Sequence, residues 1–254
     1  MMARSPDVRA PSDHIHAPPL PPRLPWINEA TLRADKLPAG RPVLIEFWDF
    51  CRVNSIRTLP YMRAWHERYE PAGLSVIGVH SAGFPPSEDP DAVRAAVERL
   101  GVPYPIVVDV EHEIWRLYDN LGWPARYLWN GEGCLFEYHY GEGAYVDTEL
   151  AIQELLGTAH EPVAPLRPED APDARLAQQS ENVEGPYSGP YAAGGVWAVL
   201  DGRGTVTANG RALEVEHPGA YPLIEHPRHT EGVLELSVGD GVTCHAVCFT
   251  PGVV

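Results

Sequence analysis

"EFWDFCRVNSIRTLPYM" (residues 46–62) joins an apolar strand to a helix and decides the fold of the first half of the chain. The run VLIEFW (43–48), which overlaps its start, has the length and composition of a buried strand. Pro60 lies inside the helix that follows and, because it lacks an N–H donor, should kink it. Apolar side chains recur there at helical spacing and are expected on one face: Ile56, Leu59, Met62, Trp65 and Tyr69. Cys51 is the only cysteine at the junction.

Strands and helices alternate through this half of the chain. Buried strands are expected at LSVIGVH (74–80) and YPIVVD (104–109), with a helix between them that Asp89 caps and Gly101 ends. The remaining expected elements are a helix over 111–122, strands over 125–130 and 134–140 joined by the hairpin signal NGEG, and a helix over 146–157 capped by Asp147. This order predicts an α/β fold in which helices cover both faces of a mixed sheet.

Changes in composition divide the chain into four parts. Residues 1–25 are a Pro-rich tail without the apolar core of a secretory signal, and residues 26–157 are the α/β domain. Residues 158–185 are rich in proline and acids, show no period, and are predicted to be a linker. Short strands separated by glycine-containing turns fill residues 186–254 and predict a small all-β sandwich or roll.

The charge of the chain restricts its partners. The sequence has 19 lysines and arginines and 35 aspartates and glutamates, which gives a formal charge of −16. Such a surface repels phosphate backbones and anionic lipid, so we expect neither nucleic acid nor a membrane as a partner. Four cysteines are too few for a disulfide scaffold, which favours a cytoplasmic protein. No motif in the sequence calls for a bound cofactor.

The first half resembles the thioredoxin superfamily and, more narrowly, its TlpA/DipZ-type thioredoxin-like (redoxin) family. Residues 47–60 match the family stretch F-W-T-Y-S-C-I-N-C-I-R-T-L-P, with the cysteines altered. The likeness continues through GVH (78–80), YP (104–105), IW (114–115), WPARYL (123–128) and GEGAYVDTE (141–149). It implies a thioredoxin-like fold over residues 26–157. The C-terminal part has a weaker similarity to the extra β domain of some DipZ-type proteins.

The resemblance implies a place for each part of the family's active site. Arg52 and Ser55 fall where the family has its two cysteines, so dithiol exchange in the family manner is excluded. Glu46 falls at the family's buried acid, although a structural role for this strand residue is the favoured interpretation. Trp123-Pro124 matches the family's cis-proline, and we expect a cis bond there rather than the commoner trans bond.

Cys51 lies one residue before the family's nucleophile position, and three roles are open to it. It is a buried bystander, a one-cysteine peroxidase or sulfenate sensor, or a site of mixed disulfides. Arg52 and Arg57 would support a thiolate electrostatically, whereas the aromatic FWDF before Cys51 favours burial, which raises a thiol's pKa. We therefore expect Cys51 to be slow toward alkylating agents.

Two functions follow from these residues. The favoured one is a binding or adaptor protein whose groove beside Trp48, Trp123 and Pro124 holds an extended peptide of a partner. The alternative is a one-cysteine thiol oxidoreductase or peroxidase that uses Cys51 with Glu46 and Arg52 around it.

The β domain carries histidines and a CHAVC motif, but we expect no metal site in it. Cys244 and Cys248 are four residues apart on one strand, which would place them on one face but too far apart to bridge. The spacing of His217, His226 and His229 matches no zinc signature.

Overall fold

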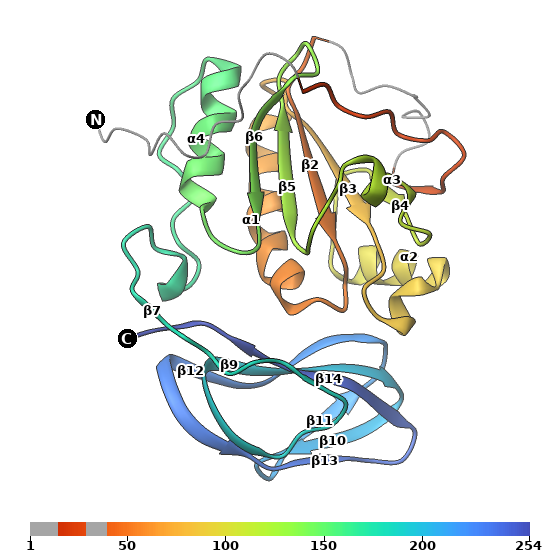
Figure 1. The fold of residues 1–254 in the computed structure, drawn as a ribbon, viewed down its shortest axis with the longest axis vertical. Coiled ribbons are helices and arrows are strands. Elements are labelled where there is room, and N and C mark those ends of the chain that lie inside the picture. The colour runs from red at the N-terminus through yellow and green to blue at the C-terminus, as the bar shows by residue number, and fades with distance from the viewer. Residues whose placement is uncertain (1–14, 29–39) are drawn as a thin grey trace.

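The computed structural model describes residues 15–28 and 40–254, which form an α/β domain followed by a β domain (Figure 1). In the α/β domain a mixed sheet has the strand order β1-β4-β3-β2-β5-β6. The central pairs β2–β3 and β3–β4 are parallel, and the outer pairs are antiparallel. Its strands are β1 (Trp26–Ile27), β2 (Val43–Trp48), β3 (Ser75–His80), β4 (Ile106–Val108), β5 (Ala125–Trp129) and β6 (Leu135–Tyr140).

Helices cover both faces of this sheet. The helices are α1 (Val53–Tyr69), α2 (Pro90–Arg99), α3 (Glu113–Leu117) and α4 (Tyr145–Leu156), with short 3₁₀ turns η2 (Pro85–Glu88) and η3 (Pro168–Asp170). Side chains of α1, α2 and α4 share one hydrophobic cluster, and those of α3 belong to a cluster on the other face. Strand β2 supplies both, because Leu44 and Trp48 face the first cluster while Ile45 and Phe47 face the second.

Two helix predictions need correction. Helix α4 begins at Tyr145 after Ala144 in the left-handed region, so Asp147 lies within the first turn and is not the cap. An acid there still interacts favourably with the helix dipole. Helix α3 is shorter than the expected 111–122, because Asp119 takes a left-handed φ of 46° soon after its end. The cap expected at Asp89 is present, since its carboxylate accepts the backbone N–H of Asp91.

The Pro-rich segments pack against the α/β domain. Leu20, within the expected tail, is buried in the cluster around α3, whereas residues 1–14 lie outside the described part. Within the expected linker, the backbone N–H of Leu166 donates to the hydroxyl of Tyr61, and Tyr61 donates to Asp170. The segment 158–185 therefore connects the domains while being held along α1.

The β domain contains two main sheets around a core of its own. One sheet has the order β12-β9-β14-β8 and the other β11-β10-β13, with a β15–β7 pair beside them. Its strands are β7 (Leu176–Ala177), β8 (Val183–Glu184), β9 (Gly189–Gly202), β10 (Gly204–Ala208), β11 (Arg211–Val215), β12 (Gly219–Leu234), β13 (Leu236–Val238), β14 (Val242–Thr250) and β15 (Gly252–Val253). Strand pairing thus begins before residue 186, the expected start of this domain.

A bulge in β14 separates the two cysteines of the CHAVC motif. The register of β14 against β9 shifts between Cys244 and Ala246. Cys244 consequently belongs to the inner cluster of the β domain, whereas Cys248 belongs to the cluster around α1. The expectation that both share one face of the strand was wrong, because a bulge inverts the alternation of side chains.

The two domains share a hydrophobic contact. Trp197, Val199, Ala246 and Cys248 of the β domain belong to the same buried cluster as Phe50, Cys51 and Val53 at the start of α1. One face of the β9–β14 sheet therefore lies against the end of the α/β domain where β2 leads into α1 (Figure 1).

Candidate functional site

Arg52 stands at the N-cap of α1, between strand β2 and the helix. Its guanidinium carbon lies 4.5 Å from the ring centroid of Phe84 and 4.5 Å from that of Trp123. Its Nη2 donates to the backbone oxygen of Gly83 at 3.1 Å. Two aromatic contacts and a hydrogen bond hold the cation in one place, and cation–π contacts of this kind are worth about 0.5–2 kcal/mol each.

Asp49 organises the backbone around Arg52. One carboxylate oxygen accepts the N–H of Cys51 at 2.8 Å, and the other accepts the N–H of Gly83 at 2.8 Å. Ser55, at the family's second cysteine position, is buried, and its Oγ accepts the N–H of Asp49 at 3.2 Å. Ser55 is therefore part of the framework of the loop and does not face a ligand.

Cys51 is buried. Its exposed fraction is 0%, and it packs in the cluster that the two domains share. Burial raises the pKa of its thiol far above the ordinary value, and the negative charges of Asp49 and Asp201 raise it further. Arg99 and Arg52 oppose this rise in pKa but do not reverse it. At neutral pH the thiol is protonated and shielded from reagents.

Glu46 is buried on β2, and its pKa is raised to about 8, chiefly by burial. Arg126 on the neighbouring strand lowers that pKa, as does the hydroxyl of Tyr104, which donates to Oε2 at 3.4 Å. These are the groups that act on Glu46, and no thiol is among them. The environment of Glu46 is that of a buried strand acid, which agrees with the favoured structural interpretation.

The expected peptide groove needs correction. Trp48 is 0% exposed and meets the ring of His80 edge-on, so it cannot line a groove. Pro124 is buried, and the peptide bond between Trp123 and Pro124 is cis. Trp123 remains half-buried at the surface, with its indole N–H donating to the backbone oxygen of Ser81 at 2.8 Å. Of the three expected binding residues, only Trp123 reaches open space.

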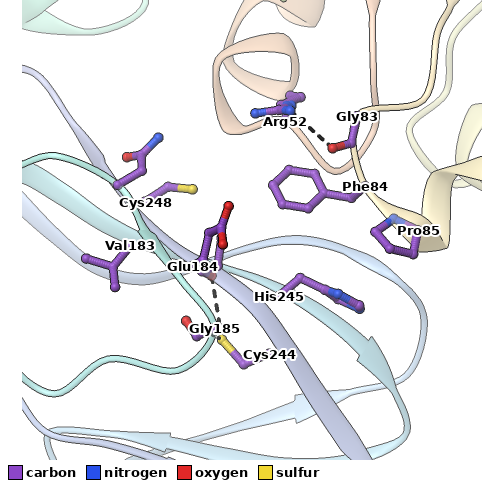
Figure 2. Close-up of a pocket in the computed structure, with 12 residues that line it drawn as sticks. Arg52, Gly83, Phe84, Pro85, Val183, Glu184, Gly185, Cys244, His245 and Cys248 are labelled. Atoms are coloured by element: carbon purple, nitrogen blue, oxygen red, sulfur yellow. Dashed lines mark hydrogen bonds between the residues drawn. The ribbon is translucent and has the colours of Figure 1, made fainter.

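A cleft of about 670 Å³ lies between the domains beside Arg52. The α/β domain contributes Arg52, Gly83, Phe84 and Pro85, and the β domain side contributes residues 182–185 with Cys244, His245, Ala246 and Cys248 (Figure 2). A smaller cavity of about 70 Å³ is lined by Trp123 on one side and by Asn182 and Cys248 on the other. The β domain thus covers the place where the family would meet its substrate.

Several residues of this cleft were not predicted. Phe84, Asn182, Glu184 and His245 line it, and of these only His245 lies in a motif that the sequence singled out, CHAVC, which was weighed as a metal site and not as the wall of a cleft. The sequence marks two of them only by their neighbours: Phe84 precedes a Pro-Pro pair, and His245 lies between two cysteines. The cleft forms because β8 pairs with β14, and no local sequence pattern predicts this pairing.

The described residues contain no group of three or more histidines, cysteines or acids placed to hold a metal ion. All four cysteines, each within the described ranges, are free thiols. No described helix has the length and apolar character needed to cross a bilayer.

The chain is similar in sequence to proteins of known families. Residues 22–135 match the model of the AhpC/TSA family. The chain is 32% identical over 200 residues to Protein DipZ of Mycobacterium tuberculosis (strain CDC 1551 / Oshkosh), which covers 74% of this chain and 29% of DipZ. This part of the chain is a thioredoxin-like redoxin domain. It is also 24% identical over 131 residues to the thiol-disulfide oxidoreductase YkuV of Bacillus subtilis (strain 168), covering 52% of this chain and 87% of YkuV.

Solved structures share the fold of the redoxin domain. A solution structure of a thioredoxin-like protein in the oxidised form superposes with a TM-score of 0.51 at 23% identity, over 57% of this chain and 97% of that one. The crystal structure of the thioredoxin-like superfamily protein SPOA0173 gives a TM-score of 0.50 at 21% identity, over 57% and 99%. The chain spans less than a third of the length of DipZ, and no two of its cysteines are separated by two residues.

Proposed function

We propose that this protein is a binding or adaptor protein built on a redoxin domain that has lost the dithiol motif, and that it holds its ligand in the cleft between its two domains. Its ligand is an extended peptide segment of a partner. The cleft volume of about 670 Å³ lies within the usual range of ligand sites, about 300–1,000 Å³. With four free thiols and no disulfide, the protein suits the reducing cytoplasm.

The position of Arg52 carries this proposal. Thiol–disulfide exchange needs a thiolate at the start of α1, and that place holds a guanidinium clamped between Phe84 and Trp123. A fixed cation with aromatic neighbours cannot attack sulfur but can bind a carboxylate or a carbonyl oxygen. In this proposal, the position of the family's nucleophilic cysteine is taken by Arg52, which binds the ligand.

One-cysteine chemistry at Cys51 is the competing function, and the surroundings of the sulfur argue against it. A peroxidatic or sensor cysteine needs an exposed, low-pKa thiol. Cys51 has 0% exposure, and burial, with Asp49 and Asp201 nearby, raises its pKa. Glu46, which would have to accept a proton in such chemistry, acts with Tyr104 and Arg126 and not with Cys51.

Turnover assays test the proposed function. The purified protein is assayed for reduction of insulin disulfides and for consumption of hydrogen peroxide, with dithiothreitol as electron donor. We expect both rates to equal those of the matched variant Cys51→Ser. Turnover by the natural sequence that disappears in Cys51→Ser would show thiol chemistry and overturn the proposal.

A further inference from the structure

On the α/β side of the cleft, the guanidinium of Arg52 is held in place with one of its nitrogens available to a ligand. Among the described residues, Arg52 has one hydrogen-bond acceptor, the backbone oxygen of Gly83, which takes Nη2. Its Nε is buried against Gly83, where an added Cβ would lie 2.6 Å away. The ring centroids of Phe84 and Trp123 each lie 4.5 Å from the guanidinium carbon. Nη1 is left with its two N–H groups for a ligand.

The opposite wall offers an acid and two polar groups. Glu184 on β8 is exposed and forms no ion pair with any residue of the described ranges. Figure 2 shows its side chain reaching from the β domain toward Phe84 and Arg52. The Oδ1 of Asn182 accepts the N–H of Phe249, and its NH₂ group is available as a hydrogen-bond donor. His245 also lines this wall of the cleft.

Charges of opposite sign therefore face the same cleft without neutralising each other. Arg52 and Glu184 line one cavity, yet no ion pair joins them in the described structure. A ligand that carries a carboxylate and an ammonium group can satisfy both. The amide of Asn182 and the imidazole of His245 suit the peptide groups between those two charges, and the ring of Phe84 suits an apolar side chain. A polyanion is disfavoured by the formal charge of −16.

We propose that the cleft recognises a short peptide segment by placing its carboxylate on Arg52 and its ammonium group on Glu184. This inference rests on the proposed binding function and names the chemistry of the ligand. The carboxylate comes either from a free peptide's C-terminus or from an acidic side chain within a partner, and the recognition chemistry at Arg52 is the same in both cases.

Blocked peptides test the two charge assignments separately. Calorimetric titrations of the full chain use the tripeptide alanyl-leucyl-alanine with free termini, its N-acetylated form, its C-amidated form and the doubly blocked form. We expect the free form to saturate and each blocking group to weaken binding about tenfold to a hundredfold, since each removes one charge-assisted contact. An amidated, free-amine peptide with an aspartate at its third position distinguishes the sources, because it binds only if a side-chain carboxylate serves.

Crossing these peptides with variants makes the test specific. In Arg52→Gln, amidation should cause no further loss while acetylation still does; in Glu184→Gln, the reverse should hold. The matched controls Arg228→Gln and Glu231→Gln lie on exposed positions of β12 and should bind all four peptides as the natural sequence does. Should Arg52→Gln unfold, Glu184→Gln alone decides, because its side chain is exposed.

Three results would overturn the inference. They are no saturable binding of any peptide at millimolar concentration, equal binding of the free and doubly blocked forms, or equal losses for all peptides in both cleft variants. Each differs from failure of the proposed function, which appears as insulin or peroxide turnover lost in Cys51→Ser whatever the peptides do.

Discussion

Glu46→Gln should change how the stability of this protein depends on pH. The pKa of Glu46 rises from an ordinary 4.5 to about 8 in the folded protein, mainly because the carboxyl is buried. The folded state therefore binds a proton that the unfolded state releases between these pH values. The stability from this group is complete below about pH 4.5 and is lost as pH rises through about 8. The shift corresponds to at most about 5 kcal/mol of unfolding free energy.

The expected result is a difference between two curves. In urea unfolding from pH 5 to pH 9, the free energy of the natural sequence should fall relative to that of Glu46→Gln as pH rises, because glutamine mimics the neutral carboxyl. The slope from other groups is common to both proteins, because burial raises the pKa of Glu142 and lowers the pKa values of His66, His139 and His217 in each of them. The control Glu98→Gln, exposed on α2, should follow the natural curve. Parallel curves for Glu46→Gln and the natural sequence would refute the reasoning.

Three further variants test the framework of the site. Arg57→Met should cost about 3–5 kcal/mol in urea unfolding at pH 7, because it leaves two mostly buried carboxylates without their cation; a loss under about 1 kcal/mol would contradict this. Gly83→Ala should lower the melting temperature, since its Cβ would lie 2.6 Å from Arg52 Nε; an unchanged value would mean that the guanidinium is not held as described. Arg52→Cys with Ser55→Cys should form a disulfide yet reduce insulin slowly, because residues of the β domain line both cavities at position 52 and limit the approach of a protein substrate; rapid turnover would show that the position is open.

The fold of the redoxin domain could be predicted because its signals are local. The apolar run at 43–48 has the composition of a strand buried on both faces, and β2 lies between β3 and β5 with every residue buried. The NGEG turn predicts the β5–β6 hairpin, which pairs as expected. The aromatic residues before Cys51 also pointed to its burial, and Cys51 is buried.

The binding residues could be predicted only in part. A strand with apolar residues on both faces does not reveal which side chain faces a groove, so the sequence predicts a groove beside Trp48, whereas this side chain fills the core. The second wall of the cleft comes from Asn182, Glu184 and His245, more than 120 residues after Arg52. That wall exists because the segment expected as a linker is held along α1 and ends in a strand of the β domain. Contacts of this range leave no periodicity in the sequence.

Alkylation of Cys51 measures most directly whether this redoxin domain retains thiol chemistry. Native protein at pH 7 is treated with iodoacetamide, and the Cys51 peptide is followed by mass spectrometry against the same protein in denaturant. A thiol that is fully buried and has a raised pKa should stay unmodified natively over the time in which the denatured protein reacts to completion. Native labelling of Cys51 at the rate of a free thiol, or faster, would contradict the account.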